Sequence, residues 1–319
     1  MSQVSRDSPA EMSRAEPASP RRLNAAPGCS RAHRLRELIL SPKLLVMPGA
    51  YDPLTARLVE EAGFEAVQCS GYGISVAHLG LPDYGFLGMR EMVDRTARLV
   101  EAVRIPVMAD GDTGFGNAVN AYHAVRAFER VGAAGVNIED QVAPKRCGHL
   151  DGRRILPLDE AVAKIRACAE ARVDPDFVIN ARTDALAIDG IEEAIRRGNA
   201  YLGAGATMVF VDGLDSVAAA RRLVQEIRGP VAINAVEGGR TPHGFDFAQM
   251  EALGIARVSL PGTTLFAAVR AIREVLLEVR SRGGIEGYED RIANFSEVQE
   301  LLGMRDLLTL EERLLGHLR

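Results

Sequence analysis

The sequence of 319 residues predicts one (β/α)8 barrel of the TIM type, an α/β fold, from three observations. Short apolar or β-branched runs recur along the chain, and longer stretches with the apolar period of a helix separate them. Segments such as Glu61 to Phe64 place a glycine just before a run, where a helix ends and a strand begins. Alternation of strand and helix predicts parallel strands joined by right-handed crossovers. Eight such units favour a closed barrel over an open sheet.

The predicted strands are apolar runs that lie at regular intervals in the chain. In order they are Leu44 to Gly49, Ala66 to Ser70, Pro106 to Asp110, Gly135 to Glu139, Phe177 to Ala181, Met208 to Val211, Val231 to Asn234 and Arg257 to Leu260. Helical stripes are clearest between the later strands, at 191–201 and 217–227. The connections after the second and fourth strands are the longest. Connections of this length are more often functional than idle, so both are candidates for site loops.

The barrel is expected over residues 35–282, between two segments of different character. Residues 1–34 are rich in serine, proline and arginine with little apolar surface, so we expect a disordered tail. Residues 283–319 contain apolar residues at the spacing of a helix, among them Phe295, Val298, Leu301 and Leu307, which predicts a C-terminal helical extension. The chain therefore predicts a single catalytic domain with a tail at one end and helices at the other.

The composition narrows the partners and the compartment. A net charge of -5, with no long basic run, argues against binding to nucleic acid or to an anionic membrane. No apolar stretch reaches the roughly 20 residues of a membrane helix. The 4 cysteines lack the spacing of a zinc site or a disulfide framework, which indicates a reducing compartment. We therefore expect a cytoplasmic protein whose partners are small molecules.

Acidic residues follow three neighbouring predicted strands. Asp110 and Asp112 end the third strand on one side of it, Glu139 ends the fourth, and Asp83 lies in the loop after the second. In a barrel of this kind these positions meet at the C-terminal face. Carboxylates that converge repel each other unless a cation lies between them, and a few hard oxygen ligands favour Mg²⁺, with Mn²⁺ as the alternative. A lone aspartate is more often a helix cap, but the set of four indicates a metal site.

Two further strand ends offer groups that bind carboxylates. Arg182 ends the fifth strand, where a guanidinium can hold a substrate carboxylate or instead pair with Asp184 or Glu139. The loop after the seventh strand offers amide, hydroxyl and backbone donors, and its candidate binding residues are Asn234, Glu237, Thr241 and Pro242. A metal site beside several anion receptors predicts a small di- or tricarboxylate substrate.

The long connection after the fourth strand contains a thiol among cations. Its five residues are Lys145, Arg146, Cys147, Gly148 and His149. Nearby cations favour the thiolate and attract anionic ligands, and a glycine lets the backbone turn. The same residues would also suit a basic surface loop with an incidental cysteine.

Together these motifs resemble the isocitrate lyase and phosphoenolpyruvate mutase superfamily from about Arg34 to the C-terminus. The matching segments are 48–52, 70–71, 79–85, 110–116, 138–142, 145–149 and 181–185. The Lys-Arg-Cys-Gly-His loop resembles the carbon-carbon lyase branch, because mutases and oxaloacetate decarboxylases lack this cysteine motif. The loop 236–242 looks closer to 2,3-dimethylmalate lyase and oxaloacetate hydrolase than to methylisocitrate lyase.

The resemblance implies roles for individual residues and an assembly. Cys147, Arg182 and His149 would be catalytic, with Cys147 as the proton donor to a carbanion. Asp110 would be the direct Mg²⁺ ligand, and the other three acids would act directly or through water. Substrate would also contact Ser70, Gly71 and Tyr72, and the loop residues Lys145, Arg146 and Gly148. The last helix would be exchanged between subunits of a homotetramer.

Two positions depart from the family pattern. Asp212 stands where the family commonly has glutamate, which shortens the reach of the carboxylate by one methylene. Gln68 stands where lyases often have an aromatic residue such as tyrosine. Both departures bear on which substrate is bound, and neither removes a predicted metal ligand or Cys147.

The leading hypothesis is a Mg²⁺-dependent lyase. It would cleave a 2-hydroxy dicarboxylate, of the 2,3-dimethylmalate, 2-alkylmalate or methylisocitrate type, into pyruvate or another 2-oxo acid and a carboxylate. One alternative is hydrolysis of oxaloacetate to oxalate and acetate, and another is a phosphoenolpyruvate mutase-type reaction. An alternative of a different class is a barrel that binds a carboxylate without turning it over.

Overall fold

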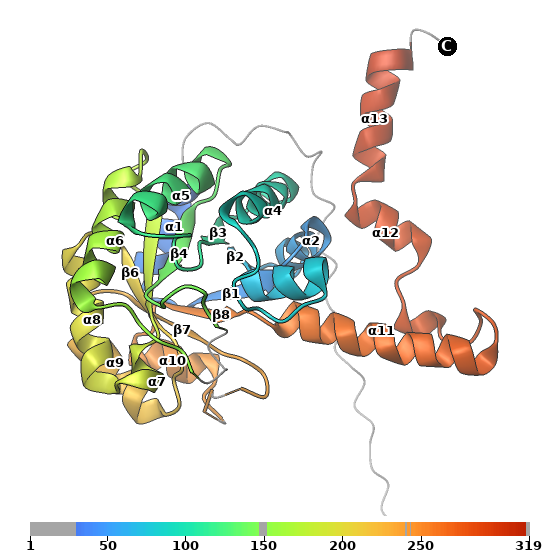
Figure 1. Ribbon diagram of the computed structural model, residues 1–319. Coiled ribbons are helices and arrows are strands. Elements are labelled where there is room, and N and C mark those ends of the chain that lie inside the picture. The colour runs from blue at the N-terminus through green and yellow to red at the C-terminus, as the bar shows by residue number, and fades with distance from the viewer. Residues whose placement is uncertain (1–29, 147–151, 240, 243, 317–319) are drawn as a thin grey trace, which may run out of the picture. The chain divides into compact units, whose positions relative to one another are not determined.

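Eight parallel strands form a closed barrel in which each strand pairs with the next and β8 pairs with β1 (Figure 1). The structure is a computed structural model that describes residues 30–146, 152–239, 241–242 and 244–316. The strands are β1 (Leu45–Ala50), β2 (Val67–Cys69), β3 (Val107–Asp110), β4 (Gly135–Glu139), β5 (Val178–Thr183), β6 (Met208–Val211), β7 (Val231–Asn234) and β8 (Arg257–Leu260). The predicted barrel is confirmed, and the ends of the predicted strands differ from the observed ends by two residues or fewer.

Helices occupy the connections between strands and also precede β1 and follow β8. They are α1 (Arg31–Leu40), α2 (Pro53–Glu61), α3 (Gly71–Ile74), the π-helix η1 (Ser75–Leu79), α4 (Met89–Ala102), α5 (Ala118–Arg130), α6 (Leu158–Ala171), α7 (Ala185–Ile188), α8 (Ile191–Gly203), α9 (Val217–Glu226), α10 (Phe247–Leu253), α11 (Thr263–Arg282), the 3₁₀-helix η2 (Glu289–Arg291), α12 (Phe295–Leu301) and α13 (Met304–Leu315). Figure 1 shows the helices from α2 to α10 around the outside of the strands.

Helix α5 illustrates why these segments are helical. Its buried residues Ala121, Ala124, Val125 and Phe128 recur at helical spacing and form one apolar stripe. Asn117 caps the helix, because its side chain accepts from the backbone N–H groups of residues 119 and 120. Burial of the stripe and satisfaction of the first N–H groups both favour the helix over other conformations.

The N-terminal end of the barrel is closed by α1. Its residues Leu35, Leu38 and Ile39 are buried in one cluster with inward residues from the starts of the strands, such as Met47 and Met208. This helix begins at Arg31, inside the segment that the sequence assigned to the tail. Ser30 caps it by accepting from the backbone N–H of His33. The guanidinium of Arg31 donates to the carbonyl oxygens of residues 100 and 103, at 2.8 Å each, which ties the helix start to the barrel.

Inward side chains form layers along the barrel axis, because side chains alternate across each strand. The layer above α1 is apolar and includes Met47, Met108 and Met208. The next layer is polar, with Gln68 from β2 and Arg257 from β8 among its members. The inward residues at the C-terminal strand ends are mostly charged or polar. Polarity therefore rises toward the C-terminal face, where the site is expected.

A buried cluster behind β4 fixes the base of the long fourth connection. Asp140 Oδ2 accepts from Tyr201 Oη at 2.7 Å, from Thr183 Oγ1 at 2.7 Å and from Arg197 Nη1 at 3.1 Å. Burial raises the pKa of Tyr201, so its hydroxyl remains protonated and donates. The backbone carbonyl of Asp140 accepts from the N–H of Leu156 at 2.8 Å. These contacts join β4, β5 and α8 to the point where the fourth connection returns to the barrel.

The chain divides into two compact units. One contains residues Gly28–Asn294 and therefore the whole barrel with α11, and the other includes residues Phe295–Arg319 with α12 and α13. The C-terminal helices are present as predicted, and their exchange between subunits stays a prediction. Within the part of the chain that the structure describes, no helix is both long enough and apolar enough to span a membrane.

The Asp140 cluster predicts a specific loss of stability in Tyr201→Phe. This change removes a buried hydroxyl that donates to a carboxylate, so we expect the free energy of unfolding to fall by about 2 kcal/mol. Chemical denaturation at a fixed protein concentration measures it. Tyr122→Phe is the matched control, because Tyr122 is half-buried on α5 and its hydroxyl has no hydrogen bond among the described residues. Equal stability of the two variants would contradict the role of the cluster.

Candidate active site

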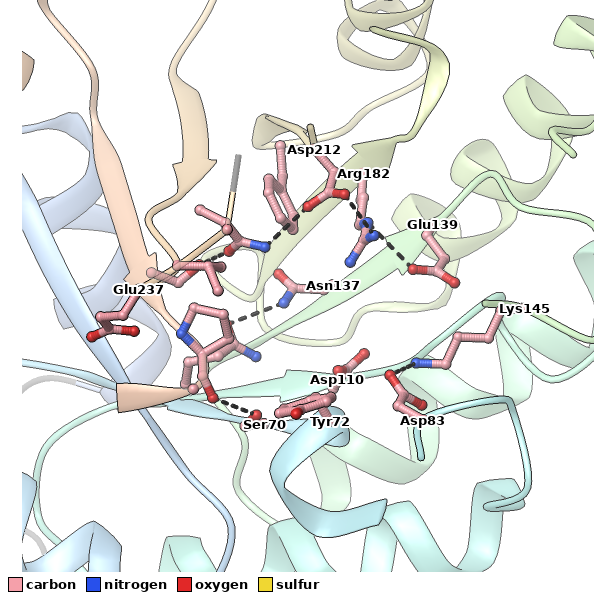
Figure 2. Close-up of a pocket in the computed structure, with 18 of the residues that line it drawn as sticks. Ser70, Tyr72, Asp83, Asp110, Asn137, Glu139, Lys145, Arg182, Asp212 and Glu237 are labelled. Carbon is pink, nitrogen blue, oxygen red and sulfur yellow. Dashed lines mark hydrogen bonds and ion pairs between the residues drawn. The ribbon is translucent and has the colours of Figure 1, made fainter. Parts of the chain in front are cut away.

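A cavity of about 290 Å³ opens at the C-terminal ends of the strands. Many of the predicted site residues line it: Ser70, Tyr72, Asp83, Asp110, Glu139, Lys145, Arg146, Arg182, Asn234 and Glu237. The labelled side chains in Figure 2 converge from several strands and loops. Alternation along the strands explains the convergence, because the inward residue at each strand end points toward the barrel axis.

The other predicted site residues lie outside the cavity wall or outside the described residues. Gly71 donates its backbone N–H to Asp110, and Asp112 forms an ion pair with Lys145. The hydroxyl of Thr241 accepts from the backbone N–H of Val236 at 3.0 Å. Pro242 is half-buried in the same loop and does not line the cavity. Cys147, Gly148 and His149 lie outside the described residues.

Asp110 is held in place by two backbone N–H groups. Its Oδ2 accepts from the N–H of Gly71 and its Oδ1 from the N–H of Asp112, both at 3.1 Å. A Cβ on residue 71 would lie 2.5 Å from Asp110 Oδ2, so only glycine permits this approach. Asp112 adopts a φ of 45°, a left-handed conformation that aspartate tolerates better than most residues. The backbone at both positions is therefore shaped around the Asp110 carboxylate.

Lys145 lies between two of the four predicted metal ligands. Its Nζ is 2.8 Å from Asp83 Oδ2 and 2.6 Å from Asp112 Oδ1, and all three side chains are buried. Burial raises the pKa of Asp112 to about 6, although the ammonium opposes the shift. Burial also lowers the pKa of Lys145, but the surrounding carboxylates outweigh this and raise it well above its usual value. The ammonium is thus charged and is held by acids, whereas the sequence assigned it to substrate.

Glu139 presents a carboxylate oxygen without a partner among the described residues. Its Oε1 is buried and has no hydrogen bond there, while its Oε2 lies 3.3 Å from Arg182 Nε. Burial raises the pKa of Glu139 well above its usual value despite the guanidinium. An orphaned buried oxygen of this kind costs free energy unless a cation or a donor reaches it. Glu139 is therefore poised to receive a positively charged ligand.

The donor set fits a Mg²⁺ ion held by few protein ligands. Among the residues that the structure describes, no three acidic, imidazole or thiol side chains form a cage for a metal ion. Mg²⁺ does not require one, since it is usually held by one or two carboxylates, with water and substrate completing the shell. Asp110 and Glu139 are carboxylates of this kind that face the cavity. Asp83 and Asp112 are engaged by Lys145 and would act through water.

Arg182 forms the charge centre of the opposite wall. Its Nε and Nη2 donate to the two oxygens of Asp184 at 2.9 and 3.0 Å, and Nη2 lies 3.2 Å from Asp212 Oδ2. The guanidinium also lies over the ring of Phe210, 5.1 Å from its centroid. Asp212 reaches this network although it is one methylene shorter than the family's glutamate. Both ion pairs that the sequence offered as alternatives to substrate binding, with Asp184 and with Glu139, are present.

Sequence reasoning missed a second guanidinium in this wall. Arg153 Nη1 lies 2.5 Å from Asp184 Oδ1 and 3.4 Å from Asp212 Oδ2, and its side chain is 4% exposed. Arg153 lies in the part of the fourth connection that leads back to the barrel. Its sequence there, two adjacent arginines, did not by itself indicate a functional site. Asn137 was also missed, although it lies two residues before Glu139 and so faces the same side of β4.

The start of the Lys145 to His149 loop is held by a side-chain clamp. Gln141 Nε2 donates to the carbonyl oxygen of Arg146 at 2.9 Å, and Gln141 Oε1 accepts from its N–H at 3.0 Å. The guanidinium of Arg146 lies over the ring of Tyr84, 5.4 Å from its centroid. These contacts fix the backbone of the residue that precedes Cys147.

The chain belongs to the phosphoenolpyruvate phosphomutase family, whose model matches residues 35–280. The resemblance seen in the sequence is thereby confirmed. The chain is 43% identical to 2,3-dimethylmalate lyase of Eubacterium barkeri over 88% of its length and 96% of that protein. It is 39% identical to a probable 2-methylisocitrate lyase of Corynebacterium glutamicum over 89% and 93% of the two chains.

A solved structure of oxaloacetate acetylhydrolase with the inhibitor 3,3-difluorooxalacetate has the same fold. Its TM-score is 0.83 at 34% identity, covering 89% of this chain and 96% of that one. The prediction of a carbon-carbon lyase agrees with the names of the two relatives, and the hydrolase alternative agrees with this structure.

The position of Lys145 predicts a pH-dependent loss of stability in Lys145→Met, measured on metal-free protein in a chelator. Removing the ammonium leaves two buried carboxylates unpaired, so at pH 8 we expect the free energy of unfolding to fall by about 3 kcal/mol. The pKa of Asp112, already raised to about 6 by burial, rises further without Lys145. The loss should therefore shrink as the pH falls through this pKa toward 5, because protonated Asp112 carries no charge.

Two further variants make this measurement specific. Lys145→Met with Asp112→Asn should recover part of the stability at pH 8, since one of the unpaired charges is gone. Lys43→Met is the matched control, because Lys43 is exposed and has no ion pair among the described residues. A loss that stays constant between pH 5 and pH 8 would show that the ion pairs are not its cause.

Proposed function

We propose that this protein is a Mg²⁺-dependent lyase that cleaves a 2-hydroxy dicarboxylate into a 2-oxo acid and a carboxylate. The observation that carries the proposal is the cavity, which the acids Asp110 and Glu139 line together with the guanidinium of Arg182. The similarity to 2,3-dimethylmalate lyase over nearly the whole chain supports the same reaction class. Pyruvate is the expected 2-oxo acid, and the substrate is of the 2-alkylmalate or methylisocitrate type.

Asp110 and Glu139 would hold the metal ion, with Asp83 and Asp112 behind them. Bound there, Mg²⁺ would lower the free energy of negative charge on the 2-hydroxyl and adjacent carboxylate oxygens of the substrate. The chain fixes Asp110 through two backbone N–H groups, and no described residue forms a hydrogen bond with Glu139 Oε1. The hard oxygen donors and the orphaned Glu139 oxygen support the choice of Mg²⁺, with Mn²⁺ as the second ion.

Arg182 would stabilise the charge of the departing carboxylate. Asp184 holds its guanidinium by two parallel hydrogen bonds, so little reorganisation is needed when negative charge develops nearby. Lys145 and Arg146 place positive charge at the cavity wall, which offsets part of the negative charge that a dianion would meet there.

Cys147 would return a proton to the carbon that leaves. As the bond between the hydroxyl-bearing carbon and its neighbour breaks, the hydroxyl becomes the carbonyl of the oxo acid and its proton goes to a base. The electron pair stays on the departing carbon, where the thiol of Cys147 delivers a proton. This role rests on the sequence motif, and the Gln141 clamp on Arg146 supports it by holding the residue before the thiol. His149 would tune the thiol.

The assembly and the compartment complete the proposal. We expect a homotetramer that exchanges its C-terminal helices. The supporting feature is α11, on which Ile272, Leu276 and Leu277 are 58%, 62% and 60% exposed and would be covered by a second copy of the chain. The two described cysteines, Cys69 and Cys168, are free and buried, which suits the reducing cytoplasm.

A second candidate function is hydrolysis of oxaloacetate to oxalate and acetate. The 34% identity to oxaloacetate acetylhydrolase over 89% of this chain favours it. The metal ligands and Arg182 would serve in the same way, but water would be the attacking group.

The substrate class is tested with malate, 2-methylmalate, 2,3-dimethylmalate, isocitrate, 2-methylisocitrate and oxaloacetate, with and without Mg²⁺. We expect release of a 2-oxo acid from an alkylmalate or 2-methylisocitrate, and its loss on addition of a chelator. Coupled reduction of the oxo acid measures the rate, and chromatography separates oxalate from pyruvate. Oxalate from oxaloacetate alone would favour the hydrolase, and no product from any compound would overturn both reactions.

Cys147→Ser tests the proton donor. A serine hydroxyl is a much weaker acid than a thiol, so we expect kcat to fall by at least about a hundredfold, the lower range for a general acid. Binding of Mg²⁺ and pyruvate should change little, because neither contact involves the thiol, and calorimetry measures it. Cys168→Ser is the control, since Cys168 is buried on α6 away from the cavity. Full activity of Cys147→Ser would remove Cys147 from the mechanism.

A further inference from the structure

Four polar side chains form a chain of hydrogen bonds across the barrel, directly beneath the cavity. They come from β8, β2, β4 and β5: Arg257, Gln68, Asn137 and Asn180. Arg257 Nη2 donates to Gln68 Oε1 at 2.7 Å, and Asn137 Nδ2 donates to the same oxygen at 3.1 Å. Asn180 Nδ2 donates to Asn137 Oδ1 at 2.6 Å. Gln68 and Asn137 also line the cavity, so the chain connects a buried guanidinium to the cavity wall.

Arg257 determines which way the amides of this chain face. A guanidinium has only donors, so the group of Gln68 that faces it must be the oxygen. Gln68 Nε2 then donates to the carbonyl oxygens of Cys69 at 2.8 Å and Met108 at 3.2 Å. A flipped Gln68 would place its NH₂ against the guanidinium and its oxygen against both carbonyls. Because Gln68 Oε1 accepts, Asn137 must meet it with its NH₂ group.

Asn137 is left with one N–H that no acceptor in the described structure uses. Its Nδ2 carries two hydrogens, and Gln68 takes one of them. The side chain lies at the cavity wall, and Figure 2 shows it in the middle of the labelled residues, between Arg182 and Asp110. Two other nitrogen donors at the cavity each have a carboxylate partner, since Arg182 holds Asp184 and Asn234 donates to Asp212 at 3.1 Å. A ligand oxygen in the cavity centre therefore has a neutral donor at Asn137.

The burial of Arg257 and its few hydrogen bonds indicate a role other than stabilising the fold. Its side chain is fully buried, and its Nε and Nη1 have no hydrogen-bond partner in the part of the chain that the structure describes. Burial lowers the pKa of Arg257 to about 10, and Asp110 opposes the shift. The ring of Phe210 lies 5.8 Å away and offers only a weak cation–π contact. A buried cation with a single hydrogen bond is costly, and an apolar side chain would fill this position at lower free energy.

We propose that Asn137 binds substrate by donating its second N–H to a carboxylate or carbonyl oxygen in the cavity centre, and that Arg257 is the positioning residue that holds Asn137 in this orientation through Gln68. The inference rests on the proposed function for the identity of that oxygen as part of a small carboxylate. It adds a neutral contact to the charged groups already described. It also gives Gln68, one of the departures from the family pattern, a defined task.

Oxalate binding in the presence of Mg²⁺ tests the inference without turnover. Calorimetry would compare the parent with Asn137→Ala, Arg257→Met and the double variant. We expect each single change to weaken oxalate binding by about tenfold, the effect of losing one hydrogen bond to a charged ligand. The double variant should bind no more than about twofold more weakly than Asn137→Ala, because Arg257 acts only through Asn137. Arg257→Lys, which keeps a donor to Gln68, should bind within about threefold of the parent.

Three outcomes would overturn the inference. They are native-like oxalate affinity in Asn137→Ala, additive losses in the double variant, and failure of the parent itself to bind oxalate. Thermal unfolding of each variant separates a loss of orientation from a loss of folding. If Arg257→Met does not fold, the oxalate affinity of Asn137→Asp is measured instead. A carboxylate facing oxalate should weaken binding by more than Asn137→Ala does. If the parent and the variants bind oxalate with the expected affinities but the protein cleaves none of the malates, the proposed reaction is contradicted and the role of Asn137 stands.

Discussion

The guanidinium of Arg182 holds together carboxylates from three neighbouring strand ends, and the shape of the cavity depends on this contact. Glu139, Asp184 and Asp212 are all buried, so each would repel the others without a cation between them. Arg153 shares two of these acids from the far side. Because the pairs are buried, salt screens them little. The wall of the cavity is therefore preorganised before any ligand enters.

Lys145 likewise holds together two buried carboxylates, Asp83 and Asp112. The net charge of the groups around the cavity matters for function. Six carboxylates lie at this level of the barrel, Asp83, Asp110, Asp112, Glu139, Asp184 and Asp212, against the four cations Lys145, Arg146, Arg153 and Arg182. The excess of negative charge would repel a dianionic substrate. A divalent cation at Asp110 and Glu139 would offset it, which supports the proposal that metal and substrate occupy the cavity together.

Beneath the layer of carboxylates lies a layer of amide side chains whose orientation depends on one buried cation, Arg257. Arg257 sets the direction of every amide in its chain, and Asn137 is the point where that order reaches the cavity. The apolar layer below, closed by α1, keeps water from the other end of the barrel. The three layers follow from one constraint, the alternation of side chains along parallel strands.

The sequence by itself determined the barrel, the strand positions and the acids of the site, because hydrophobic period and strand-end position are local signals. It also predicted Arg182, Asn234 and Glu237, which line the cavity, and Thr241 and Pro242, which do not. Only the tertiary structure decided the partners of Lys145, since the residues it pairs with lie in two other connections. The same holds for Arg153 and Arg257, which resemble ordinary loop and strand arginines in the sequence. Their roles arise from burial and from contacts between distant strands, and neither quantity exists until the barrel closes.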